Sequence, residues 1–183
     1  MSSSDRSRSR VARGGRPIAL AAGAIAALTL AACTVQPLYA PTVAGTSVTN
    51  TIGSVYIEEV DKRLAQEVRN KLIFALNGGA GQPANPAYRM KLSVSSSETA
   101  LGVTTFETAP AYSITVAATY EVVSVTTGNI VYRSTARGTA SFDRVNQIYA
   151  NTRAKLDAEN RAAALAADQI RIRLSAEAAK GTI

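Results

Sequence analysis

The chain contains no histidine and no tryptophan, and Cys33 is its only cysteine. Without histidine there is no Ser–His–Asp or Cys–His nucleophile system, and the usual zinc ligand sets are incomplete. Paired carboxylates could still serve a glycosidase. The acidic residues that lie closest in sequence are Glu58, Glu59 and Asp61, and they precede a predicted helix, where negative charge favours the helix dipole. We therefore expect no enzyme, no metal site and no cofactor.

Cys33 ends a segment that is typical of bacterial lipoprotein precursors. Five arginines lie between residues 6 and 16, residues 17–30 carry no charge, and Leu30-Ala31-Ala32 precedes the cysteine. A charged region, a short apolar region and small residues before a cleavage site make up a secretory signal peptide, and this apolar stretch is too short to span a bilayer. A cysteine buried in the core would be a simpler interpretation, but it does not explain the preceding segment. We predict a signal peptide over 1–32 and lipid modification of Cys33.

A lipid anchor at Cys33 places the protein at a membrane. A single acyl chain binds membranes only marginally, whereas two or more hold a protein stably. In lipoproteins that resemble this one, Asp directly after the cysteine favours the inner membrane. Thr34 occupies that position here, which indicates the outer membrane.

The rest of the chain suits one domain held together by packing. Removal of residues 1–32 takes away five Arg and one Asp, so the net charge falls from +7 to +3 and the case for nucleic-acid binding weakens. About 150 residues fit a single core. A lipid-modified Cys33 leaves no cysteine for a disulfide.

Residues 33–76 divide into a linker, a strand and a helix. Residues 40–54 are small and polar, so we predict a lipidated N-terminus and linker over 33–54 and a folded domain over 55–183. A short strand over 55–57 precedes a helix over about 61–76. One face of this helix is apolar and consists mainly of Leu64, Val68, Leu72 and Leu76, and Asn77-Gly78-Gly79 ends it.

The second half of the domain predicts three strands and one helix. Alternating apolar and polar residues from Tyr88, Tyr112 and Ile130 onwards indicate antiparallel strands, with a hairpin turn at 126–129. An alanine-rich helix over about 149–179 has an apolar line of Tyr149, Thr152, Leu156, Ala163, Ala167, Ile170 and Leu174. The predicted fold class is α+β, in the order β-α-β-β-β-α: a mostly antiparallel four-stranded sheet with two helices packed on one face. The first helix would form a right-handed crossover if its two flanking strands are parallel.

Three motifs resemble the LPS-assembly lipoprotein family (LptE). Cys33 is followed by Thr34-Val35-Gln36-Pro37-Leu38-Tyr39, similar to the family's cysteine, three residues and Pro-Leu-Tyr, although members often have Gly-Phe where this chain has Thr34-Val35. The first helix is preceded by Ile-Glu-Glu-Val-Asp-Lys-Arg at 57–63, and the last helix carries the other motif at 157–161 and 165–171. The predicted element order also looks like the fold of this family.

This resemblance implies a protein that sits as a plug in the lumen of the outer-membrane barrel LptD, assists its assembly and contacts LPS on the way to the cell surface. The domain would lie on the periplasmic side or in the barrel lumen. The alternative is a periplasmic lipoprotein that shuttles lipid or lipoprotein, with an acyl chain held against the sheet. A shuttle needs a large apolar cavity. Three Phe, no Trp and two helices over the apolar sheet face favour the plug.

Four basic residues are candidates for contact with LPS phosphates: Arg89, Lys91, Arg133 and Arg137. They fall on the polar side of the alternation, and Arg or Lys binds phosphate through charge-assisted hydrogen bonds. An ordinary solvated face, or cations that protect edge strands, would give the same pattern.

The last helix carries two large apolar residues away from its apolar line. Leu165 and Ile172 lie on the opposite side at 100° per residue, which makes them candidates for contact with the barrel partner. Scattered exposed apolar residues are also common on surfaces that bind nothing.

Overall fold

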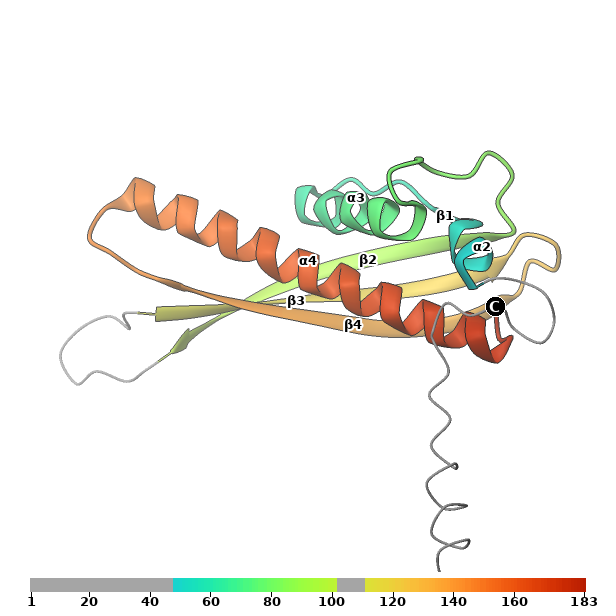
Figure 1. Ribbon diagram of the computed structural model, residues 1–183. Helices are drawn as coiled ribbons and strands as arrows, with labels where there is room; N and C mark the ends of the chain where they lie inside the picture. The colour runs from blue at the N-terminus through green and yellow to red at the C-terminus, as the bar shows by residue number, and fades with distance from the viewer. Residues whose placement is uncertain (1–47, 102–110) are drawn as a thin grey trace, which may run out of the picture. The chain divides into compact units, whose positions relative to one another are not determined.

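The computed structural model describes residues 48–101 and 111–183. They form helix α2 (Val48–Gly53), strand β1 (Val55–Ile57), helix α3 (Arg63–Asn77), strands β2 (Tyr88–Leu101), β3 (Ala111–Ser124) and β4 (Ile130–Asp143), and helix α4 (Ile148–Lys180). The sheet order is β1-β2-β3-β4, with β1 parallel to β2 and the other pairs antiparallel. Helices α3 and α4 pack on one side of this sheet (Figure 1). The predicted α+β class and its mostly antiparallel four-stranded sheet are confirmed.

The strands follow the predicted alternation of buried and exposed residues. Strands β2 and β3 pair along their full length from Tyr88–Ser124 to Leu101–Ala111 without a register shift. On β3, on β4 and on β2 as far as Val94, alternate side chains point toward the core, which includes Met90 on β2 and Val116 on β3, both 0% exposed. Residues 95–101 of β2 are all exposed. The predicted turn between β3 and β4 is present, because the Ser124 N–H donates to the Asn129 carbonyl and Gly128 has a φ of 70°.

Helix α3 connects the two parallel strands, so the predicted crossover has the required strand direction. Its buried residues are Ala65, Val68, Leu72 and Leu76. The helix ends at Gly78, whose φ of 58° lies in the left-handed region and whose N–H donates to the Phe74 carbonyl. The glycine that the sequence suggests as a helix stop therefore acts as one.

Helix α2 corrects the predicted linker. Val48 and Ile52 are 1% and 3% exposed, and the helix contacts both α3 and α4. Six residues are too few to show a helical period, and a helix this short persists only through packing against its neighbours. The prediction of a linker is therefore wrong over 48–53. The rest of the predicted linker, Cys33 and the predicted signal peptide lie outside the described residues.

Helix α4 lies close against β4 because the facing residues are small. A Cβ atom on Gly138 would stand 2.0 Å from the Ala162 carbonyl oxygen and 2.7 Å from the Ala166 nitrogen. Alanines therefore line the buried side of the helix, namely Ala158, Ala162, Ala163, Ala166, Ala167 and Ala178. The backbone of α4 can approach β4 closely only because residue 138 has no side chain.

The predicted apolar line of α4 is correct over its second half and wrong at its start. Ile170 and Leu174 are 0% exposed, whereas Tyr149 is 78% exposed and Thr152 is also exposed. The first turns of α4 diverge from the sheet and extend past α3, so their inner side is not covered (Figure 1). A constant angle per residue cannot show where a straight helix leaves a twisted sheet.

Candidate functional site

The side of the sheet opposite the helices is polar. All four basic residues predicted to face solvent are exposed there: Arg89, Lys91, Arg133 and Arg137. Lys91, Glu121 and Arg133 occupy one cross-strand row, since Glu121 pairs with Lys91 on β2 and with Arg133 on β4. The predicted placement of these cations is therefore correct, while their role in binding stays a prediction.

These cations differ in whether another side chain of the domain already contacts them. An Arg133 Nη2–Glu121 Oε1 ion pair spans 2.8 Å, and the Arg89 guanidinium lies 5.5 Å from the centre of the Tyr56 ring. Among the described residues, no carboxylate forms an ion pair with Lys91 or Arg137. Lys91 and Arg137 are thus the more available partners for an external anion.

Hydroxyl side chains cover most of the remaining polar face. Thr115 and Thr139 hydroxyls lie 3.1 Å apart, and those of Thr119 and Thr135 lie 3.0 Å apart across the β3–β4 pair. The rows on either side add Ser93, Ser95, Ser97, Thr99, Ser113 and Ser141. Such a surface offers many donors and acceptors without requiring an apolar partner.

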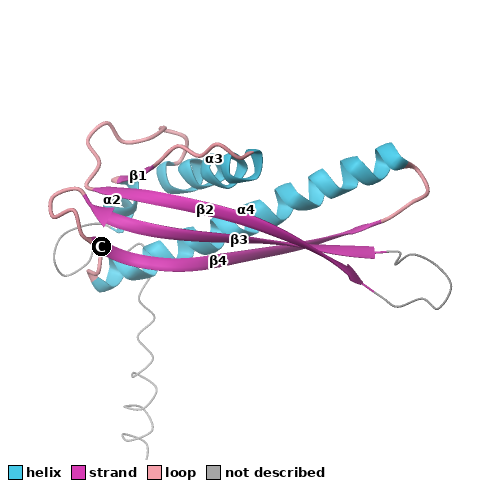
Figure 2. Cartoon of the chain, turned by 180° about the vertical axis from the view of Figure 1, so that it is seen from behind, coloured by secondary structure: helices cyan, strands magenta, loops and turns pink. Residues whose placement is uncertain are grey.

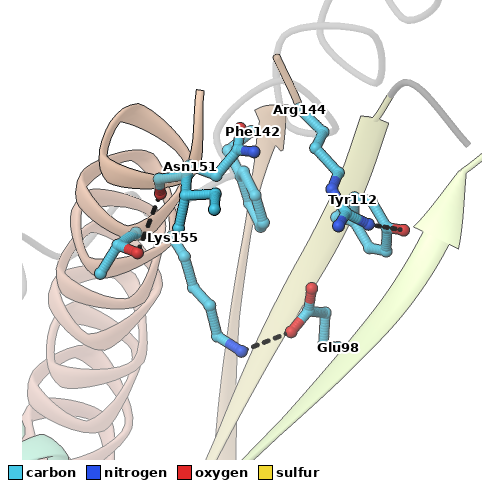
Figure 3. Close-up of a pocket in the computed structure, with 8 residues that line it drawn as sticks. Glu98, Tyr112, Phe142, Arg144, Asn151 and Lys155 are labelled. Carbon is cyan, nitrogen blue, oxygen red and sulfur yellow. Dashed lines mark hydrogen bonds and ion pairs between the residues drawn. The ribbon is translucent and has the colours of Figure 1, made fainter. Parts of the chain in front are cut away.

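A cavity of about 400 Å³ lies where α4 diverges from the sheet (Figure 3). Its aromatic side consists of Tyr112 and Phe142, which stack with ring centres 5.7 Å apart and an interplanar angle of 20°. The Arg144 Nη1 donates to the Tyr112 hydroxyl at 3.1 Å, and its guanidinium carbon lies 5.8 Å from the centre of that ring. One side of the cavity is therefore apolar and carries a cation at its edge.

The other side of this cavity is charged. Lys155 Nζ on α4 lies 2.6 Å from Glu98 Oε2 on β2 (Figure 3), and this hydrogen bond raises the pKa of Lys155 above its ordinary value. Arg144 has no ion pair with a carboxylate among the described residues. The cavity thus combines two cations, one of them already neutralised, with an aromatic surface.

Sequence reasoning missed this cavity. No single strand or helix periodicity relates Arg144 to Lys155, because Arg144 follows a strand and Lys155 lies within a helix. Only the structure marks the place, through Ile148 and Tyr149 at the start of α4, which are 85% and 78% exposed.

Leu165 and Ile172 are exposed as predicted, at 48% and 51%. Leu165 borders β4, since its Cβ would lie 2.9 Å from a Cβ on Gly138. Ala158, which the helical angle places near these two residues, is instead 0% exposed. The two large residues remain separate exposed positions, and their contact with a partner stays a prediction.

A buried phenol lies beneath α4. Tyr120 is 0% exposed, and its hydroxyl lies near Ser134 and Tyr132 without forming a hydrogen bond of normal geometry within the part of the chain that the structure describes. Burial raises the pKa of Tyr120 well above its ordinary value, and the nearby Tyr132 adds to the effect. This residue is a neutral core side chain at physiological pH.

Family comparison identifies the domain. The family model described as LptE: Lipopolysaccharide-assembly matches residues 52–174. The chain belongs to the LptE family. The match runs from α2 to late α4, so it includes the whole sheet, the basic polar face and the cavity beside α4.

Solved structures share the fold of this LptE-family chain. A presumed lipoprotein of Caulobacter crescentus matches at 22% identity with a TM-score of 0.60, covering 70% of this chain and 93% of its own. A minor lipoprotein of Acinetobacter baumannii matches at 15% identity with a TM-score of 0.55, covering 68% of this chain and 91% of its own. Rare lipoprotein B of Shewanella oneidensis matches at 14% identity with a TM-score of 0.54, covering 70% of this chain and 97% of its own. None of the curated proteins compared is a match.

Membership of the LptE family makes this chain a lipoprotein of LPS assembly, in a family that is not enzymatic. Across residues 48–101 and 111–183, no group of three acidic, histidine or cysteine side chains could hold a metal ion. Within the same residues, no helix combines the length and apolar character needed to cross a membrane.

Proposed function

We propose that this LptE-family protein is an outer-membrane lipoprotein, anchored through Cys33, that plugs the LptD barrel, helps it assemble and assists LPS transport. The observation that carries this proposal is the uncovered polar face of a sheet with three strands of 14 residues each. Its hydroxyl rows and cations suit the polar interior of a barrel and the phosphates and sugars of LPS. The protein acts by binding, without catalysis.

Contact with LPS is proposed at two places. On the polar face, Arg89, Lys91, Arg133 and Arg137 would meet phosphates, with Lys91 and Arg137 the more available. At the end of the sheet, Arg144 stands beside the stacked rings of Tyr112 and Phe142. An amphiphile needs a cation next to an apolar surface, and this cavity offers both.

The described residues favour the plug over the shuttle. The apolar sheet face is covered by α2, α3 and α4, whose inner residues are buried with those of the strands. Besides the 400 Å³ cavity, two further surface cavities measure about 370 and 420 Å³. Such volumes suit a small ligand and not a whole lipid with several acyl chains.

Charge reversal tests LPS contact. We expect Arg133→Glu with Arg137→Glu, and separately Arg144→Glu, to reduce capture on immobilised LPS by about tenfold, since each reversed charge repels phosphate. Arg153→Glu, an exposed change on α4 outside both places, should leave capture unchanged. Circular dichroism should report the same fold for all variants. Equal capture by all three variants would remove LPS contact from both places.

A further inference from the structure

One acidic residue of β2 lies on the core side of the sheet. Side chains at alternate positions of a strand share a face, so Glu98 lies on the same face as the buried residues Met90 and Val94. Its cross-strand partner on β3 is Ile114, which is 2% exposed. A carboxylate thus occupies a position where the alternation of a half-buried strand predicts an apolar side chain.

Glu98 lines the cavity beside α4, next to its aromatic side. On the core side of the sheet, the row Ala100–Tyr112–Phe142 lies two residues further along the strands than the row that contains Glu98. Of the described helices, α3 covers the first part of β2 and α4 continues toward the far end of the sheet (Figure 2). The Glu98 side chain is 34% exposed, so its carboxylate can turn toward solvent without disturbing the core.

The partner of Glu98 is a cation that lines the same cavity. Lys155 Nζ lies 2.6 Å from Glu98 Oε2, and the Lys155 side chain is 47% exposed. An ion pair with this exposure contributes little to stability, because water screens both charges. A second carboxylate near Lys155, that of Glu159, is already paired with Arg63 of α3. Departure of Glu98 would therefore leave Lys155 available to a different anion.

The charge of the cavity suits a phosphate once Glu98 has left Lys155. Among the described residues that line it, Glu98 is acidic and Arg144 and Lys155 are basic, which gives a net charge of +1. A phosphate monoester carries about −1.5 to −2 at neutral pH and has three strong acceptor oxygens. The guanidinium and the ammonium together match that charge, and both donate charge-assisted hydrogen bonds.

We propose that Glu98 is an internal competitor for Lys155: its carboxylate holds the ammonium in the free protein, and a phosphate group of LPS displaces it on binding. This inference rests on the proposed function, which places LPS contact at this cavity. The displaced carboxylate stays close by and returns to Lys155 as the phosphate leaves. Such competition weakens binding and speeds release, and transport requires a site that its ligand can leave as well as enter.

Protection of the sheet edge is the competing explanation for Glu98. An inward-pointing charge on an edge strand hinders pairing with another chain, and none of the described residues pairs with the outer edge of β2 beyond Met90. Edge protection needs the charge alone, whereas competition needs the contact with Lys155. The two explanations therefore differ in whether the effect of Glu98 on LPS binding depends on Lys155.

The rate at which LPS dissociates from the full-length lipoprotein tests the proposal. We expect Glu98→Gln to slow dissociation of LPS in detergent micelles about fivefold, because Lys155 then stays available to phosphate. In a Lys155→Met background, the same change should alter the rate less than about twofold, since nothing remains to compete for. Dephosphorylated LPS should leave wild type and Glu98→Gln at equal rates. Asp143→Asn, which removes an exposed charge outside the cavity lining, is the control for net charge and should alter the rate less than about twofold.

The outcomes separate this inference from the proposed function. Unchanged dissociation from Glu98→Gln, with Arg144→Glu still impairing capture, would overturn the competition and leave LPS contact at the cavity in place. Equal slowing with and without Lys155 would also overturn it, because Glu98 would then act through its charge alone. If wild type and all variants fail to capture LPS, the proposed contact and this inference fail together.

Acetylation of lysines in the unmodified protein gives an independent test. We expect LPS to protect Lys155 about fivefold, since the amine then donates to phosphate, whereas dephosphorylated LPS should give no protection. Lys180, which pairs with Glu177 at 2.7 Å outside the cavity, is the matched control and should react equally with and without LPS. Peptide mass spectrometry measures both. Lys155 that reacts equally in the LPS-bound protein would contradict displacement, and this result decides the question if Glu98→Gln aggregates.

Discussion

At the scale of single residues, packing in this domain depends on small side chains and on a few polar groups in unusual places. Gly138 lies under the backbone of α4, and Tyr120 carries a hydroxyl into the core beneath the same helix. Neither feature can be recognised from the alternation of the strands, because both depend on where α4 crosses the sheet. Both make definite predictions for stability.

Gly138→Ala should destabilise the domain strongly. The new Cβ would lie 2.0 Å from the Ala162 carbonyl oxygen, so α4 must move away from β4 and lose its alanine packing. Overpacking of this kind costs about 1–3 kcal/mol and occasionally more. Gly53→Ala is the matched control, since its Cβ would meet the Asn77 Oδ1 at an ordinary 3.7 Å. Urea unfolding that gives equal midpoints for both variants would show that α4 does not approach β4 as described.

Tyr120→Phe should keep or raise stability. The hydroxyl forms no hydrogen bond of normal geometry among the described residues, so its removal ends a desolvation cost while the ring stays in place. We expect a change in the free energy of unfolding within about 1 kcal/mol or in the stabilising direction, whereas Tyr120→Ala should cost about 3–5 kcal/mol. Thermal and urea unfolding measure both. A loss of several kcal/mol in the Phe variant would mean that the hydroxyl is bonded.

At the scale of elements, period-based reasoning succeeds where an element lies on the sheet and fails where it leaves it. Strands β3 and β4, the first half of β2 and helix α3 have the predicted faces, because neighbouring elements cover one side of each. Helix α2 is too short to show a period, and the start of α4 diverges from the core, which exposes Tyr149. The cavity containing Arg144 and Lys155 follows from that divergence, so it could not be predicted from the sequence.

The exposed residues of α4 give a prediction about the partner. Leu165 and Ile172 are half-exposed large side chains on a helix whose other face is buried. We expect photo-crosslinkers at both positions to capture LptD in cells, because large apolar side chains are the common anchors of protein interfaces. Asp168, exposed between them in sequence, is the comparison position. Adducts with LptD elsewhere on the domain but none at Leu165 or Ile172 would make these two residues ordinary surface.

At the scale of the whole molecule, the described domain has two unlike sides. Three helices cover one side of the sheet, and hydroxyls and cations form the other. At one sheet edge, Arg161 and Arg173 of α4 donate to carbonyls of β4, and at the other edge none of the described residues pairs with β2 beyond Met90. Such a molecule presents polar groups on its surface, to which a surrounding partner can bind without a large enclosed cavity. That arrangement underlies the proposal of a plug.

Anchoring is also a property of the whole chain. Cys33→Ala should abolish lipid labelling and leave an unprocessed precursor, because the thiol is the predicted attachment point. Labelled palmitate followed by membrane fractionation measures the result. Cys33→Ser, which keeps a similar shape but replaces the sulfur with oxygen, should behave in the same way. Label that persists on either variant would contradict the lipoprotein anchor at this residue.

The most direct test of the central proposal is affinity purification of the full-length lipoprotein from detergent-solubilised outer membrane. We expect LptD to copurify at about one copy per lipoprotein, since a plug occupies a single barrel lumen. Quantitative mass spectrometry of the purified material measures that ratio. Recovery of the lipoprotein without LptD, as a free protein that carries lipid, would contradict the plug and support the shuttle instead.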